Sequence, residues 1–171
     1  MIKMIIMDVD GVLTDGSITL SESGEELKTF NIKDGMGIVL ALKAGIKIAF
    51  LSARYSKALA LRAKEIGVTE IHHGSSKKIS VVEKIMKDNS LKAEDIAYIG
   101  DDLNDIPAMK ITGFPCAVGD AIKEVKDIAK YISGEKGGRG AVREIIEYIL
   151  KKDGVYEKAI NAFFKEKDSK A

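Results

Sequence analysis

Short apolar runs alternate with amphipathic segments along this chain, and several of the apolar runs end at a small or acidic polar residue. Runs with the length of buried strands occupy residues 4–7, 46–51, 68–73, 95–100 and 114–118, with a shorter one at 129–132. Segments with a helical pattern lie between or after them, at 38–44, 56–66, 79–89, 106–110 and 141–152. This alternation predicts an α/β fold, a doubly wound parallel sheet covered by helices on both faces.

One segment departs from this pattern. Two alternating runs, at 17–20 and 27–32, flank Ser23 and Gly24, which is typical of a β-hairpin. The hairpin stands where a doubly wound fold normally places its first crossover helix. We expect it to project beside the end of the first strand, as a flap or as an oligomer contact.

Length and charge narrow the class of protein. A chain of 171 residues suits a single domain with a sizeable core, and its net charge of +1 gives no reason to expect nucleic acid or an acidic membrane as partner. No uncharged stretch approaches the roughly 18 residues of a membrane span. The single cysteine, Cys116, excludes an internal disulfide and fits a reducing compartment. We therefore expect one cytoplasmic domain over residues 1–171.

Two aspartates end the first strand. Asp8 and Asp10 follow the run at 4–7, and a strand pleat continued by one step would point both side chains to the same side. An aspartate-rich turn is the alternative. An EF-hand calcium loop is excluded, because that loop needs Asp or Asn at position 12 and Glu at position 19, where this chain has Val12 and Thr19.

Complementary groups end the other predicted strands and favour a site over a turn. Ser52 ends the second strand, Lys78 stands at the head of the third predicted helix, and the fourth strand runs into an acidic cluster, Asp101, Asp102 and Asp105. Parallel strands bring these ends to one edge of the sheet, where ligands bind in such folds. Two carboxylates about 4 Å apart repel by roughly 4 kcal/mol at an effective dielectric constant near 20. A hard cation such as Mg²⁺, together with Lys78, would offset that repulsion.

This group of residues predicts phosphoryl transfer. Asp8 would act as the nucleophile and form an aspartyl-phosphate, and Asp10 would protonate the leaving alcohol and then activate water. Ser52 would donate a hydrogen bond to a transferring phosphoryl oxygen. We expect Asp102 and Asp105 to orient neighbouring groups rather than to bind the metal directly.

These motifs resemble a known family. DVDGVLT, Ser52, Lys78 and GDDLND are similar, in the same order, to the four motifs of the haloacid dehalogenase superfamily of phosphohydrolases. From residue 4 to about 150 the chain also resembles a subfamily without a cap domain, the 3-deoxy-D-manno-octulosonate 8-phosphate (KDO 8-phosphate) phosphatases. The segments that carry this second resemblance are FNIKDGMGI, LSAR, LRAKEIG, AYIGDDLND and GGRGAVRE.

The resemblance implies a Mg²⁺-dependent sugar-phosphate phosphatase of lipopolysaccharide biosynthesis. It also implies a homotetramer in which the hairpin (about 17–32) and the C-terminal tail (about 154–171) help to close neighbouring active sites. The metal ligands it implies are Asp8, Asp10 through its carbonyl, and Asp101. The substrate contacts it implies are Asp10, Asn31, Ile32, Lys33, Asp34, Gly35, Arg54, Arg62 and Lys78.

Some questions stay open at this level. Val39 stands where the subfamily usually has an arginine, so the substrate could instead be a related sugar phosphate such as a nonulosonate 9-phosphate. A non-catalytic binding subunit with the same fold is disfavoured, because no motif residue is lost. A phospho-accepting receiver domain is disfavoured by the order of its acidic residues. Arg139 either marks a turn or contacts substrate or a second subunit.

Overall fold

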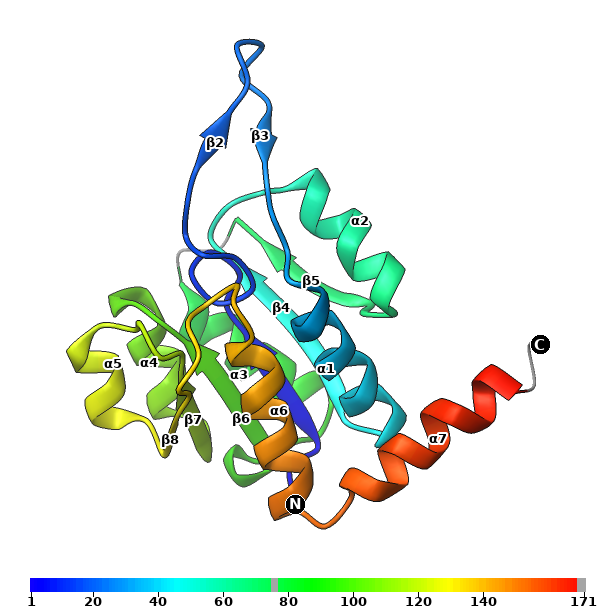
Figure 1. The fold of residues 1–171 in the computed structure, drawn as a ribbon. Coiled ribbons are helices and arrows are strands. Elements are labelled where there is room, and N and C mark those ends of the chain that lie inside the picture. Colours follow the sequence, from blue (N-terminus) through cyan, green and yellow to red (C-terminus); the bar gives the residue numbers. More distant parts are fainter. Residues whose placement is uncertain (75–76, 169–171) are drawn as a thin grey trace.

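Six parallel strands form one sheet in the order β5–β4–β1–β6–β7–β8 (Figure 1). The computed structural model describes residues 1–74 and 77–168, so the last three residues of the predicted C-terminal tail lie outside the described part. The strands of the sheet are β1 (Met4–Met7), β4 (Lys47–Ser52), β5 (Glu70–His73), β6 (Ile96–Gly100), β7 (Phe114–Ala117) and β8 (Tyr131–Ile132).

Strand β1 holds the centre of the sheet. All four of its residues are fully buried, and Met7 is in register with Phe50 of β4 on one side and Ile99 of β6 on the other. The chain runs outward from β1 in both directions, so the strand order reverses there. Ligands bind at the carboxyl ends of the strands at such a switch point.

Helices cover both faces of this sheet, which confirms the predicted fold class (Figure 1). Helices α1 and α6 pack against each other on one face, with α7 beside α1, while α3 and α4 lie on the other face. No helix in the described residues is long and apolar enough to cross a membrane. The helices are α1 (Ile32–Lys43), α2 (Lys57–Ile66), α3 (Lys78–Asp88), α4 (Ile106–Lys110), α5 (Lys123–Ile128), α6 (Ala141–Lys152) and α7 (Tyr156–Asp168), with short 3-10 turns η1 (Ala93–Asp95) and η2 (Leu103–Asp105).

The predicted hairpin is present and projects from the sheet, but its paired part is short (Figure 1). Strands β2 (Thr19–Leu20) and β3 (Glu26–Leu27) pair through two residues each. The second run was predicted to continue as strand to residue 32, whereas α1 begins there. The Asn31 side chain caps that helix by accepting a hydrogen bond from Lys33 N at 2.8 Å, so helix capping ends the extended run.

Helix α7 also differs from the sequence prediction, which indicated only a charged segment beyond residue 154. The segment is mostly polar, but it turns apolar side chains toward the core. Ala159 is fully buried, and Val155, Tyr156, Ile160 and Phe163 pack against the core. This spacing of three and four residues is that of one helix face.

Asp34, in the first turn of α1, caps the neighbouring helix α6. Its carboxylate accepts hydrogen bonds from the backbone N–H groups of Gly140 at 3.2 Å and Arg143 at 2.9 Å. Gly140 is the N-cap residue of α6 and has no side chain to do this itself. Burial raises the pKa of Asp34, although the backbone hydrogen bonds act against that rise. The contact locks α1 to α6 close to the sheet edge.

A glycine loop supports the turn that follows β1. A Cβ atom on Gly137 would lie 1.7 Å from the Gly11 carbonyl oxygen, so only glycine fits there. The adjacent Gly138 has a positive φ of 64° and donates a backbone hydrogen bond to Val12 O at 2.9 Å. Arg139 forms an ion pair with Asp15 at 3.0 Å. Residues 137–139 therefore pack against the turn after β1 and stabilise its position.

The Glu144 carboxylate anchors this loop to α6. It accepts hydrogen bonds from Ser133 Oγ at 2.6 Å, Tyr131 Oη at 2.9 Å and the backbone N–H groups of Gly134 at 3.0 Å and Glu135 at 3.2 Å. Burial acts to raise the pKa of Glu144, but these hydrogen bonds lower it below its ordinary value of 4.5. The carboxylate form therefore stabilises the folded protein.

The close packing of Gly137 predicts that Gly137→Ala lowers the free energy of unfolding by about 1–3 kcal/mol, because the added methyl group must displace backbone. Denaturant titration would measure this loss. Gly134→Ala is the matched control in the same loop, since its Cβ would come no closer than 3.8 Å to another group. Equal losses in the two variants would contradict the packing argument.

The lowered pKa of Glu144 predicts a pH-dependent loss in Glu144→Gln. At neutral pH we expect the free energy of unfolding of the variant to be about 1–3 kcal/mol lower than that of the wild type, because the amide can accept hydrogen bonds from fewer of the four donors. The stabilisation that comes from the lowered pKa is complete above pH 4.5, the ordinary pKa of the group. It is lost as the pH falls through the pKa of the folded state. The difference between wild type and variant should therefore narrow in acid, as measured by denaturant titration against pH. A constant difference, or an equal effect of the exposed Glu157→Gln, would contradict it.

Candidate active site

A tight turn after β1 brings Asp8 and Asp10 to one cleft. The strand ends at Met7, and the backbone N–H groups of residues 12, 13 and 14 all point to the Val9 carbonyl oxygen, at 2.9–3.3 Å. The strand pleat that we predicted to orient both aspartates thus stops before Asp10, and the turn orients them instead. The cleft has a volume of about 210 Å³ and is lined by Asp8, Asp10, Ala53, Arg54, Asp101, Asp102 and Asn104.

Lys78 contacts two of the acidic side chains at this site. It is the first residue of α3, and its side chain is only 1% exposed. Its Nζ lies 2.8 Å from Asp8 Oδ1 and 2.7 Å from Asp105 Oδ1. Burial acts to lower the pKa of Lys78, but the carboxylates of Asp8 and Asp105 raise it above its ordinary value. Lys78 therefore stays charged in the interior of the protein.

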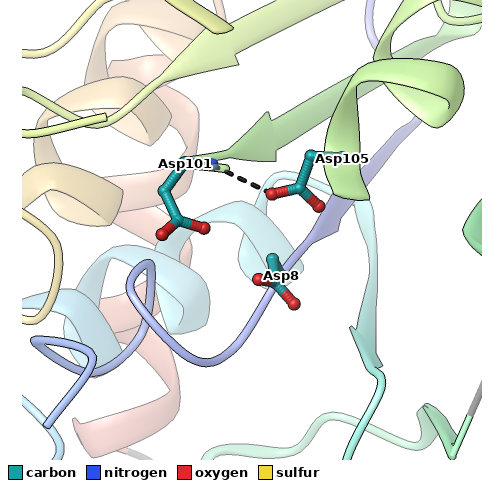
Figure 2. A group of neighbouring side chains, drawn as sticks. All are labelled: Asp8, Asp101 and Asp105. Carbon is teal, nitrogen blue, oxygen red and sulfur yellow. Dashed lines mark hydrogen bonds between the residues drawn. The ribbon is translucent and has the colours of Figure 1, made fainter. Parts of the chain in front are cut away.

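Asp105 connects the groups around it. Its Oδ1 also accepts a hydrogen bond from the buried Tyr98 hydroxyl at 2.7 Å. Its Oδ2 accepts from the backbone N–H of Asp101 at 3.0 Å, the bond drawn in Figure 2, and from that of Asp102 at 3.4 Å. Both of its oxygens are thus occupied by donors from the protein itself. Asp102, the other residue expected to orient neighbours, is exposed, and its side chain accepts from Leu103 N at 2.7 Å.

Three carboxylates face one another at this point (Figure 2). Oxygen atoms of Asp8, Asp101 and Asp105 lie within 4.8 Å of one another. Burial and the neighbouring charges of Asp8 and Asp105 raise the pKa of Asp101 to about 8. Burial and Asp105 raise that of Asp8 to about 6, even though Lys78 lowers it. Lys78 alone does not balance this concentration of negative charge.

The donor set fits a hard divalent cation. Asp101 Oδ1 is buried and has no hydrogen-bond partner among the described residues. A carboxylate oxygen left without a donor beside a second carboxylate is suited to a metal ion that prefers oxygen ligands, such as Mg²⁺. Asp8 and Asp101 can hold such an ion, while Asp105, whose oxygens are both engaged, orients Asp101.

Ser52 and Arg54 arrive from the next strand. Ser52 ends β4, is 1% exposed, and lies 3.5 Å from Asp10 Oδ2. Its hydroxyl also donates to the Arg54 carbonyl oxygen at 2.9 Å. Arg54 is half-exposed at the cleft, where its guanidinium contacts Glu26 of β3 at 2.5 Å. The second strand end therefore stands beside Asp10, as the sequence predicts for parallel neighbours.

The remaining predicted substrate contacts lie in and around α1. Asn31, Asp34, Gly35 and Arg62 line a separate small cavity of about 10 Å³. A Cβ on Gly35 would lie 2.1 Å from a guanidinium nitrogen of Arg62, so glycine makes room for this side chain. Neighbouring Ile32 and Lys33 are exposed at the start of α1. The structure thus groups residues 31–35 with Arg62, apart from the cleft that holds Asp8.

Two further residues contact the site but were not singled out from the sequence. Lys28, just after β3, forms an ion pair with Asp10 and lies 2.7 Å from Glu26. Burial acts to lower the pKa of Lys28, but hydrogen bonds to these two carboxylates raise it. Glu26 and Lys28 are two residues apart in an extended segment and so share a side, which was an available signal. Tyr98, the other residue, carried only the weak signal of a hydroxyl within an apolar strand.

Comparison with known proteins agrees with this geometry. Residues 25–146 match the family model described as haloacid dehalogenase-like hydrolase. The 3-deoxy-D-manno-octulosonate 8-phosphate phosphatase KdsC of Escherichia coli is 39% identical over 158 residues, which is 92% of this chain and 84% of that protein. The phosphatase of the same name from Yersinia pestis is 42% identical over 149 residues, 87% of this chain and 80% of that protein.

Solved structures are similar over nearly the whole chain. The phosphatase from Moraxella catarrhalis, in complex with a magnesium ion, a phosphate ion and KDO, has a TM-score of 0.91 and 36% identity, covering 95% of this chain and 93% of that one. The cobalt-bound phosphatase from Haemophilus influenzae has a TM-score of 0.87 and 39% identity, covering 91% of each chain. Sequence, fold and the acidic cleft agree, and this chain belongs to the haloacid dehalogenase-like hydrolases.

Proposed function

We propose that this protein is a Mg²⁺-dependent phosphatase that hydrolyses KDO 8-phosphate to KDO and phosphate. The observation that carries the proposal is the position of Asp8, held 2.8 Å from the buried Lys78 and beside an Asp101 oxygen that has no hydrogen-bond partner in the described part of the chain. A carboxylate next to a fixed cation and a metal site can receive a phosphate dianion. The similarity to KDO 8-phosphate phosphatases over 92% of the chain supports the choice of substrate.

In the first step, a carboxylate oxygen of Asp8 attacks the phosphorus atom, and the bond from phosphorus to the sugar oxygen breaks. Asp10 gives its proton to that departing oxygen, so the sugar leaves as a neutral alcohol. Lys78 and Ser52 hold the phosphoryl oxygens, together with backbone N–H groups of the turn after Asp8. Asp8, Asp101 and the Asp10 carbonyl would hold Mg²⁺, which when bound would offset the negative charge of the phosphate.

In the second step, Asp10, now a carboxylate, takes a proton from a water molecule. The resulting hydroxide attacks the phosphorus atom of the aspartyl-phosphate, and the bond to Asp8 breaks. Inorganic phosphate leaves, Asp8 regains its carboxylate, and Asp10 is again protonated. Asp10 thus serves first as the acid and then as the base. Its position in the turn after Asp8, lining the same cleft, supports this double role.

We also propose that Arg54 and Arg62 contact the sugar acid part of the substrate. Arg54 lies at the rim of the cleft and would pair with a sugar carboxylate. Residues 31–35 and Arg62 stay predicted contacts, and Asp34 would act there through the segment it anchors, since its carboxylate already caps α6. Val39, half-buried in α1, does not line the cleft. Because Val39 stands where the subfamily usually has an arginine, a related sugar phosphate such as a nonulosonate 9-phosphate is still the compound to test beside KDO 8-phosphate.

The same proposal includes assembly into a homotetramer. Hairpin residues Ile18, Leu20 and Leu27 are 58–62% exposed, and an apolar surface on a projecting hairpin is suited to contact with a second copy of the chain. Such contacts would place residues of a second copy beside the open cleft and enclose it. We place the protein in the cytoplasm, which the lone, buried Cys116 supports.

Phosphate release tests the reaction. With Mg²⁺ we expect turnover of KDO 8-phosphate well above that of other sugar phosphates, including a nonulosonate 9-phosphate, and we expect EDTA to remove it. Asp8→Asn should lower kcat by at least about 1,000-fold, because an amide is a poor nucleophile. Asp127→Asn, in an exposed ion pair of α5, is the matched control and should keep full activity.

Two outcomes of this assay would contradict the proposal in different ways. Equal turnover of the whole panel would keep the mechanism and remove the substrate assignment. Activity that persists in EDTA, or in Asp8→Asn, would contradict the mechanism itself.

Light scattering after size-exclusion chromatography tests the assembly. We expect the mass of a tetramer for the wild type and a smaller mass for the double variant Leu20→Lys, Leu27→Lys, because charge would replace the apolar contact. The variant should also raise KM. Leu61→Lys, at a leucine of α2 that is 71% exposed, is the control. A monomeric wild type with full substrate selectivity would contradict the proposal.

A further inference from the structure

The base of the hairpin holds a buried lysine against Asp10. Lys28 donates a hydrogen bond to Asp10 Oδ1, and its Nζ lies 2.7 Å from Glu26 Oε1. Its side chain is 3% exposed, although most of the hairpin around it faces solvent. Removing an ammonium group from water is unfavourable unless charged partners offset the lost hydration. The two carboxylates therefore determine where Lys28 lies.

Glu26 connects this contact to the second strand end. Its Oε2 accepts a hydrogen bond from Arg54 at 2.5 Å, and the backbone N–H of Arg54 donates to Ser52 Oγ at 3.1 Å. Strands β2 and β3 pair through only two residues each, and a hairpin of that size has little stability of its own. The ion pairs at its base therefore fix the hairpin relative to the cleft, and with it Lys28.

The two oxygens of Asp10 are held differently. Lysine has N–H donors and no acceptor, so Asp10 Oδ1 must accept. When Asp10 is a neutral carboxyl group, its proton consequently resides on Oδ2. That oxygen lies 3.5 Å from Ser52 Oγ, a hydroxyl with a closer acceptor in the Arg54 carbonyl at 2.9 Å. Oδ2 is therefore the less firmly held oxygen of a side chain that lines the cleft.

We propose that Lys28 is a positioning residue that makes Asp10 Oδ2 the oxygen through which protons are transferred. As the bond from phosphorus to oxygen breaks, its electron pair goes to the leaving oxygen, which takes the proton from Oδ2. Asp10 becomes a carboxylate, still bonded to Lys28 through Oδ1, and Oδ2 later takes a proton from the attacking water. This inference rests on the proposed function, in which Asp10 is the acid and base.

The test compares two kinds of leaving group. A sugar alcohol must be protonated as it leaves, whereas p-nitrophenolate leaves as an anion and needs no acid. The quantity to measure is kcat/KM, because it includes only the steps up to departure of the leaving group. The variants are Lys28→Met, which keeps the length of the side chain without its charge, and Lys28→Arg, which keeps a donor. Lys64→Met, at an exposed lysine of α2, is the control.

We expect Lys28→Met to lower kcat/KM by about 10- to 100-fold for the preferred sugar phosphate and by less than about 3-fold for p-nitrophenyl phosphate. Lys28→Arg should recover most of the loss, and Mg²⁺ affinity measured by calorimetry should be unchanged. Circular dichroism would verify that each variant is folded, and Lys28→Arg carries the test if Lys28→Met does not fold. In that case the kcat/KM of Lys28→Arg for the sugar phosphate should stay within about 10-fold of the wild-type value, and its kcat/KM for p-nitrophenyl phosphate should be unchanged.

Other results would overturn the role of Lys28. An equal loss for both substrates, in either variant, would mean that Lys28 binds the phosphoryl group or supports the fold. A weaker affinity for Mg²⁺ would place it in the metal site, and unchanged or faster sugar-phosphate turnover in Lys28→Met would remove it from catalysis. A wild-type protein without phosphatase activity would instead overturn the proposed function.

Discussion

The site depends on one buried lysine shared between two carboxylates. Lys78 is almost wholly removed from water, and its position is tolerable only because Asp8 and Asp105 both lie within 2.8 Å of its Nζ. Asp105 in turn bonds the Tyr98 hydroxyl and the backbone of Asp101. Through these contacts α3, β1, β6 and η2 are fixed relative to one another. The excess of negative charge that remains beside Asp101 is what suits the site to a divalent cation.

Much of this arrangement follows from the sequence, because parallel strands share one edge. Apolar runs that end at Asp8, at Ser52 and before Asp101 indicate both the sheet and the edge at which those residues meet. The structure confirms the doubly wound fold, and the comparisons confirm the family. The individual roles of the site residues stay predictions.

What the sequence did not reveal depends on contacts between distant segments. The Asp34 carboxylate accepts a hydrogen bond from the N-cap residue of α6, which lies 106 residues later, and no local pattern encodes such a partner. Lys28 contacts Asp10, a residue 18 positions earlier in the chain, and only the fold brings the two together. The start of α1 was misplaced for a different reason: two glycines and an alternating pattern suggested no helix, whereas the Asn31 cap and the close approach of α6 at Gly37 favour one.

The glycine loop over the turn after β1 has a consequence for the order of folding. The ion pair between Arg139 and Asp15 joins residues 124 positions apart, and Gly137 packs on the carbonyl of Gly11 in the same region. During translation, at about 5–20 residues per second, the first strand emerges several seconds before this loop does. During those seconds the central strand and the acidic turn of the nascent chain lack the contacts that residues 137–139 later supply. A chain made only as far as the first strand would have the aspartates without the loop that supports their turn, so the proposed phosphatase activity would arise only after residues 137–139 have been synthesised.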